Sequence, residues 1–194
     1  PVSAPENHYV RIKADNRLEA DGTLRGTFTL TAEGQSDSNI RRIFTTGFQS
    51  EWKSTMERQL LAISPKARLL SVDYGKNPKD YQAAPIKITF RYEIPDYALK
   101  GEGEMFFRPM VMNNLYNQVR SYMWIDTSVE NRKYGFKDAC SRLVELDETV
   151  QLPAGYKLVS AVKDETMQGV GADFEGSLVQ KGNKVLLHNR LALK

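Results

Sequence analysis

Alternating apolar and polar positions mark the start of the chain as a pair of β-strands. In residues 23–31 every second position is apolar or is Gly26, and the intervening positions are polar. Residues 9–15 alternate in a similar way, and the Asp-Gly pair ending at Gly22 favours a tight turn between the two segments. We therefore predict an antiparallel hairpin.

Between about residues 37 and 63 the apolar positions change to helical spacing. They are Ile40, Ile43, Phe44, Phe48, Trp52, Met56, Leu60 and Ile63. Gly47 interrupts this run, and Pro65 stops it because the residue before a proline disfavours the α region. The pattern predicts one bent helix or two short helices whose apolar stripe covers one face of a sheet.

Strand patterns return on both sides of a polar loop. Residues 67–74 have strand character, and residues 86–94 alternate cleanly between apolar and polar side chains. Residues 1–95 are thus predicted to form an antiparallel ββ-helix-ββ layer. A polar stretch with proline and glycine follows at residues 96–103, and we interpret it as a connection.

The last part of the chain is predicted to form more short strands. Residues 144–152 alternate, and residues 174–179 and 184–193 flank a Gly-Asn turn at Gly182. This pattern is typical of a small antiparallel β-sandwich over residues 104–194. The expected fold class is therefore mainly β (α+β), with the layer followed by the sandwich.

Composition and charge exclude several classes of protein. The chain has 194 residues, of which 41% are hydrophobic and 26% are charged, as in ordinary globular domains. The net charge of +3 is dispersed, which argues against a nucleic-acid partner. No apolar run approaches the roughly 18 residues of a transmembrane segment. A start at Pro1, with no signal peptide, suggests a segment whose export signal lies elsewhere.

The last third of the sequence resembles a known family. Its elements are the RKYGF segment at 132–136, an alternating strand, the LPAGY segment at 152–156, a strand from Phe174, the Gly182 turn and a strand ending at Leu193. This order resembles the C-terminal domain of unknown function that follows the transglutaminase-like core in exported proteins of Gram-negative anaerobes of the Bacteroides type. The preceding hairpins and helical insert are compatible with the region that links that core to the domain.

The resemblance implies a setting and a partner. The segment would be periplasmic or at the cell surface, and its partner would be an adjacent transglutaminase-like domain of the same parent chain. It does not imply catalysis in this segment, whose function would be that of an uncharacterised, non-catalytic accessory domain.

The residues that could carry chemistry favour structural interpretations. Cys140, with His8 or His188, is the thiol-imidazole combination that the sequence offers, and we interpret the thiol as half-buried and structural. Glu145, Asp147 and Glu148 could in principle serve as acid and base, but Glu145 and Asp147 share a strand face opposite the apolar residues, so we interpret these carboxylates as solvated. No spacing typical of metal ligands or of a cofactor site occurs, so we predict no catalytic residue, metal or cofactor.

An aromatic stretch provides candidates for ligand binding. They are Phe107, Tyr116, Tyr122 and Trp124. Flat aromatic faces can line a groove for carbohydrate or peptide, although they equally fill the space between β-layers. The alternative function is therefore a module that binds a surface polysaccharide or peptide.

Overall fold

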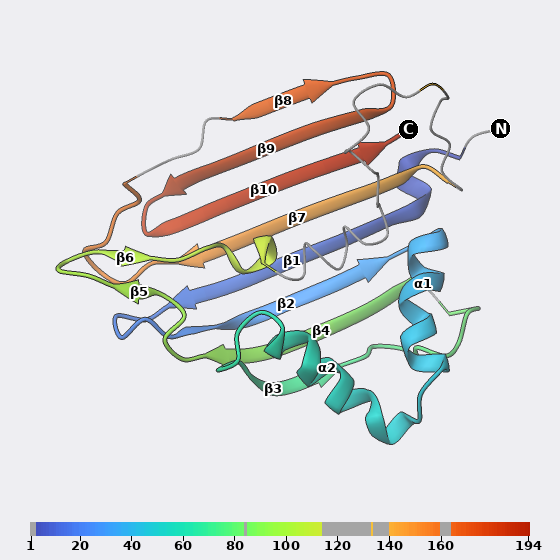
Figure 1. The fold of residues 1–194 in the computed structure, drawn as a ribbon, viewed down its shortest axis with the longest axis horizontal. Helices are drawn as coiled ribbons and strands as arrows, with labels where there is room; N and C mark the ends of the chain where they lie inside the picture. Colours follow the sequence, from blue (N-terminus) through green and yellow to red (C-terminus); the bar gives the residue numbers. More distant parts are fainter. Residues whose placement is uncertain (1–2, 84, 114–132, 134–139, 160–163) are drawn as a thin grey trace.

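The computed structural model describes residues 3–83, 85–113, 133, 140–159 and 164–194. In this part of the chain, eight strands form one sheet in the order β3-β4-β2-β1-β7-β10-β9-β8 (Figure 1). They are β1 (Tyr9–Leu18), β2 (Leu24–Ala32), β3 (Arg68–Asp73), β4 (Ile86–Ile94), β7 (Arg142–Gln151), β8 (Glu165–Gln168), β9 (Ala172–Lys181) and β10 (Lys184–Leu193). The prediction of a mainly β fold is confirmed.

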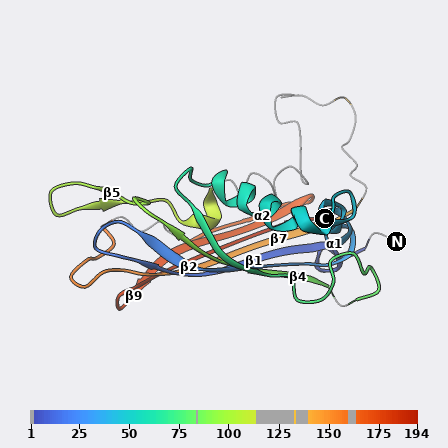
Figure 2. The same cartoon turned by 90° about the horizontal axis from the view of Figure 1, so that it is seen from below.

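Shorter elements accompany the sheet. They are α1 (Gly34–Thr45), α2 (Trp52–Leu61), the 3₁₀ turns η1 (Pro5–His8), η2 (Gln49–Glu51) and η3 (Met110–Met112), and the hairpin of β5 (Leu99–Lys100) with β6 (Met105–Phe106). The predicted helical insert is thus two helices, and Gly47 lies between them. Both helices lie on the same side of the sheet (Figure 2).

The centre of the sheet is a parallel pair. Strand β1 pairs with β7 over Tyr9↔Leu143 to Arg17↔Gln151, and the other strand pairs are antiparallel. The expectation of an antiparallel sheet therefore fails at this pair. Without β7, the side of β1 that faces away from β2 would expose a row of unpaired N–H and C=O groups.

The β-sandwich expected for residues 104–194 is not confirmed. Strands β7, β10, β9 and β8 extend the sheet begun by residues 9–94. Their alternating pattern predicts one buried face for each strand, but it does not say whether that face packs on a second sheet. The division of the chain into units 1–95 and 104–194 stays a prediction.

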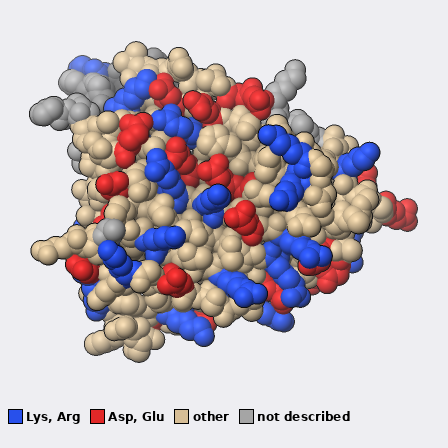
Figure 3. All heavy atoms as spheres, turned by 180° about the vertical axis from the view of Figure 1, so that it is seen from behind, with Lys and Arg blue, Asp and Glu red and all other residues tan. Residues whose placement is uncertain are grey.

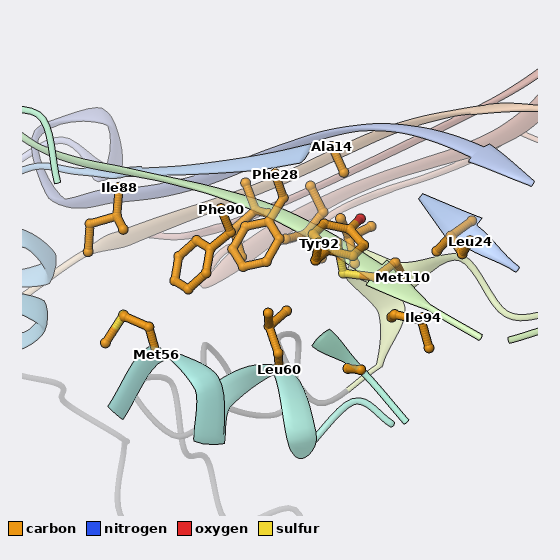
Figure 4. Close-up of a cluster of buried hydrophobic side chains, with 14 of the residues drawn as sticks. Ala14, Leu24, Phe28, Met56, Leu60, Ile88, Phe90, Tyr92, Ile94 and Met110 are labelled. Atoms are coloured by element: carbon orange, nitrogen blue, oxygen red, sulfur yellow. The ribbon is translucent and has the colours of Figure 1, made fainter. Parts of the chain in front are cut away.

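The main core lies between the sheet and the helices. Met56 and Leu60 of α2 point towards the aromatic residues of β2 and β4 (Figure 4). Phe28 stacks on Phe90 with ring centroids 4.2 Å apart, and Tyr92 is fully buried beside them. The opposite face of the sheet presents Lys and Arg interspersed with Asp and Glu (Figure 3).

Candidate functional site

A carboxylate is buried on the helix-covered face of the sheet. Glu148 lies near the middle of β7 and is 2% exposed. Its neighbours in register are Ala14 of β1 and Leu187 of β10, which cannot solvate a charge. A buried carboxylate needs hydrogen-bond donors, so its partners define the site.

Glu148 is the centre of a network that joins four parts of the chain. Asn16 of β1 donates from Nδ2 to Glu148 Oε1 at 2.7 Å, and the backbone N–H of Val111 in η3 donates to Oε2 at 3.0 Å. The Tyr92 hydroxyl of β4 donates to Asn16 Oδ1. We call Glu148, Asn16, Tyr92 and Val111 the buried carboxylate network.

The network depends on a missing side chain in β2. Gly26 lies between Asn16 and Tyr92 in the register of β1, β2 and β4. A Cβ atom at this position would overlap Asn16 Oδ1. Glycine in a strand commonly permits such a close approach, and here it lets a tyrosine contact an asparagine across the strand between them.

Burial controls the proton affinity of these groups. Desolvation raises the pKa of Glu148, and the N–H groups of Val111, Asn16 and Met110 offset this only in part. Desolvation also raises the pKa of Tyr92, and the negative charge of Glu148 acts in the same direction. The pKa of Tyr97 is raised for the same two reasons, in that order. Both phenols therefore stay neutral while Glu148 titrates.

A second set of hydrogen bonds holds the segment around η3. The Tyr97 hydroxyl donates to the carbonyl oxygen of Arg108 at 2.6 Å and accepts from Asn113 Nδ2 at 2.7 Å. Met110 and Val111 are fully buried. The segment from Arg108 to Asn113 is thus attached to the sheet both by apolar side chains and by polar groups.

Next to this segment, the sheet has an apolar cavity of about 270 Å³. Phe174, Leu178 and Leu187 of β9 and β10 line it together with Pro109 and Met112 beside η3. Arg108, Glu165, Gly176, Ser177 and Asn189 complete the lining. The volume is slightly below that of ligand pockets, about 300–1,000 Å³, so the cavity suits a side chain or a small molecule.

The exposed face of the sheet carries paired charges. Glu145 contacts Arg11 of β1, and its Oε1 lies 3.7 Å from Arg190 Nε of β10. His188 Nδ1 lies 2.7 Å from Asp147 Oδ1, and both side chains are largely exposed. Such surface pairs contribute little to stability.

Asp147, His188 and Ser177 occupy one row across β7, β10 and β9, an order similar to a serine-hydrolase triad. In the described part of the chain no hydrogen bond joins His188 to Ser177, and the row lies on an open face. A nucleophile needs activation by its base, so this row does not constitute an active site.

The thiol of Cys140 and the two imidazoles are in different surroundings. Cys140 is half-buried, and its structural role stays a prediction. His8 accepts from the backbone N–H of Gln35 at 3.1 Å, and His188 is bonded to Asp147. Each imidazole therefore has a local partner.

The aromatic ligand candidates are described only in part. Phe107 is half-buried and packs against the core. Tyr116, Tyr122 and Trp124 lie outside the described residues. Their role in binding stays a prediction.

The described residues lack two further features. They contain no group of three or more His, Cys, Asp or Glu side chains arranged to hold a metal ion. In the same part of the chain, no helix has the length and apolar character to span a membrane.

Sequence reasoning placed Glu148 with the solvent-facing carboxylates, and the structure corrects this. Its position has the same parity as Val144, Leu146 and Val150, which indicates the buried face. Asn16 shares the buried side of β1 in the same way. A polar residue at an apolar position of an alternating strand was the signal that could have found both.

Comparison with known proteins gives one match. A family model with the description "Domain of Unknown Function with solved-structure structure (DUF3858)" matches residues 103–194, slightly less than half of the chain. No curated protein and no solved structure matches the chain. The range of the match begins within the connection predicted at residues 96–103.

Proposed function

We propose that this chain is a non-catalytic accessory region of an exported protein that also carries a transglutaminase-like core. The match of residues 103–194 to a domain of unknown function supports the C-terminal part of the resemblance. The core, the periplasmic or cell-surface location and the accessory role belong to the proposal.

One observation carries the accessory role. The matched range supplies β7 to β10, and its strand β7 pairs along nine residues with β1, which lies outside the match. The buried carboxylate network crosses the same boundary, because Glu148 is bonded to Asn16. The matched segment is therefore built onto its neighbour in the chain, as expected of a region that completes or supports a larger protein.

The test compares the parent protein with and without this region. We expect removal to lower the melting temperature or alter the localisation of the remaining protein, because a docked neighbour stabilises its partner. Unchanged stability, localisation and activity would contradict the accessory role. In the intact parent, Cys140→Ala should leave every measured activity unchanged; lost activity would instead indicate catalysis within this region.

The apolar cavity supports a second candidate, a peptide-binding module. Its lining by Phe174, Leu178 and Leu187 fits an apolar peptide side chain better than a polysaccharide, which needs many polar partners. Titration with the blocked amino acids N-acetyl-leucine amide and N-acetyl-phenylalanine amide, followed by NMR, should shift the signals of these residues. Leu178→Trp should fill the cavity and abolish the shifts, whereas Leu61→Trp at an exposed site should keep them. No shift in the wild-type chain would exclude this candidate.

A further inference from the structure

We propose that Glu148 is a proton-operated latch: with a neutral carboxyl group the η3 segment stays on the sheet, and loss of the proton favours its release. This property does not depend on the proposed function. It concerns the segment Arg108–Asn113, which we call the η3 segment, and its attachment to β7.

The attachment is direct and lies in a dry environment. Glu148 Oε2 accepts from the Val111 N–H at 3.0 Å, and Val111 is fully buried. The groups that face the carboxyl from the packed elements are uncharged: Ala14 and Asn16 on β1, Leu187 on β10, and the backbone of η3. The titratable groups that interact with it are the phenols Tyr92 and Tyr97, which are neutral. Among the described residues, an ionised Glu148 is therefore held by neutral dipoles and has no cation beside it.

Asn16 allows the network to exist in two protonation states. In the structure Asn16 donates to Glu148 and accepts from Tyr92, an arrangement suited to an ionised carboxylate. If the amide turned over, Oδ1 would accept from a neutral Glu148 hydroxyl and Nδ2 would donate to the Tyr92 oxygen. The Tyr92 hydroxyl would then lose its hydrogen-bond acceptor, Asn16 Oδ1. The Tyr92 hydroxyl therefore disfavours the neutral, protonated form of Glu148.

The direction of the latch follows from linkage. Burial raises the pKa of Glu148 while the segment is closed, and release would hydrate the carboxyl and return its pKa towards the ordinary range. Protons therefore bind more tightly to the closed form. Closure is favoured below the ordinary carboxyl pKa, and this advantage is lost as pH rises through the raised value.

Release would change the cavity as well. Met112 of η3 and the neighbouring Arg108 and Pro109 line it, as does Leu187 of β10, which is the register neighbour of Glu148. Movement of the η3 segment would therefore remove one wall of the cavity. In this way the proton on Glu148 controls access to an apolar surface.

Hydrogen exchange of the Val111 amide tests the latch in the full chain. The opening constant, obtained by dividing the exchange rate by the intrinsic rate at each pH, should rise from mildly acidic to mildly alkaline conditions. One linked proton limits the rise to about tenfold per pH unit. The amide of Ile12, in the strand between β2 and β7, should not follow this rise, because the opening is local.

Two variants and a control separate the latch from a passive contact. Glu148→Gln keeps an acceptor for Val111 and can donate to a turned Asn16, so its opening constant should be low and independent of pH. Glu145→Gln, on the exposed face of the same strand, should retain the wild-type profile. Tyr92→Phe removes the hydroxyl that disfavours the neutral form of Glu148. The pH at which the opening constant of the Val111 amide rises should therefore move upward.

The outcomes divide clearly. Equal pH profiles for the wild type and Glu148→Gln, or opening that decreases as pH rises, would overturn the proposal. If Glu148→Gln does not fold, the Tyr92→Phe profile decides: an upward displacement supports the latch and an unchanged profile refutes it.

Discussion

Tyr92 and Asn16 are joined by a hydrogen bond across strand β2, although Tyr92 belongs to β4 and Asn16 to β1. The bond is feasible because β2 has Gly26 at the crossing point. Asn16 in turn donates a hydrogen bond to Glu148. The hydrogen bonds that connect β4, β1 and β7 therefore depend on the absence of a side chain at Gly26. This dependence can be tested by substitution.

Gly26→Ala should destabilise the protein by about 3 kcal/mol, because the new methyl group would overlap Asn16 Oδ1 and the carbonyl oxygen of Asp15. Denaturant-induced unfolding measures the effect. Gly171→Ala is the matched control, since a Cβ at that position meets no atom within 4 Å. Similar losses for both variants would show that a general effect of replacing glycine by alanine, and not the crossing, governs the loss.

A buried ion pair on α1 should be far more important than an exposed one on α2. Arg41 Nε donates to Asp37 at 2.6 Å, and Arg41 also donates to the carbonyl oxygen of Pro78 at 3.1 Å. Arg41 is the buried partner, and Arg41→Ala would leave the half-buried Asp37 without its cation, so we expect a loss of about 3 kcal/mol in unfolding free energy.

Lys53→Ala provides the control for this prediction. Lys53 and Glu57 have the same spacing on a helix, but their side chains are 66% and 43% exposed. The expected loss is below about 0.5 kcal/mol. If Arg41→Ala and Lys53→Ala lowered the unfolding free energy by comparable amounts, the contacts of Arg41 would not be important for stability.

His8 should stabilise the beginning of α1. Its Nδ1 accepts from the Gln35 N–H, one of the amides that lack a partner within the helix. His8→Ala is expected to cost about 0.5–2 kcal/mol, as for other N-cap acceptors, and thermal unfolding measures it. His188→Ala removes an imidazole from the exposed face and should have a smaller effect. An equal effect would indicate that His8 does not act as a cap.

Asp173 should report on the end of β10 through its titration. Its pKa is lowered, chiefly by the hydrogen bond from Lys194 Nζ at 2.8 Å. Lys194→Ala should therefore move the Asp173 midpoint upward in a carboxyl NMR titration. Because the folded pKa is depressed, the stabilising contribution is present above the unfolded pKa and is lost as pH falls through the folded value.

The stabilities of the wild type and Lys194→Ala should consequently converge in acid. Lys181→Ala, at the other end of β9, serves as the control and should leave the Asp173 midpoint in place. A midpoint that does not move in Lys194→Ala would remove the assigned cause of the lowered pKa.

Local patterns predicted the elements of this protein well. The alternation of residues 86–94 predicted the strand that the structure shows over the same residues, and the helical spacing interrupted at Gly47 predicted two short helices as one of its alternatives. Neighbouring residues decide such features, because the period of apolar positions follows backbone geometry. Strand β8 was not predicted, and its four residues are all exposed, so they offer no apolar alternation to detect.

The sequence by itself determined which face of β1, β4 and β7 packs on the core. The parity of Glu148 matches that of Val144, Leu146 and Val150, although the sequence alone led us to assign this carboxylate to the solvent face. Only the tertiary structure decided that β7 lies beside β1, that both halves share one sheet, and that Asn16 and Val111 surround the carboxylate. The physical reason is that side-chain periodicity is local, whereas strand pairing and the partners of a buried charge bring together residues more than a hundred positions apart in the chain.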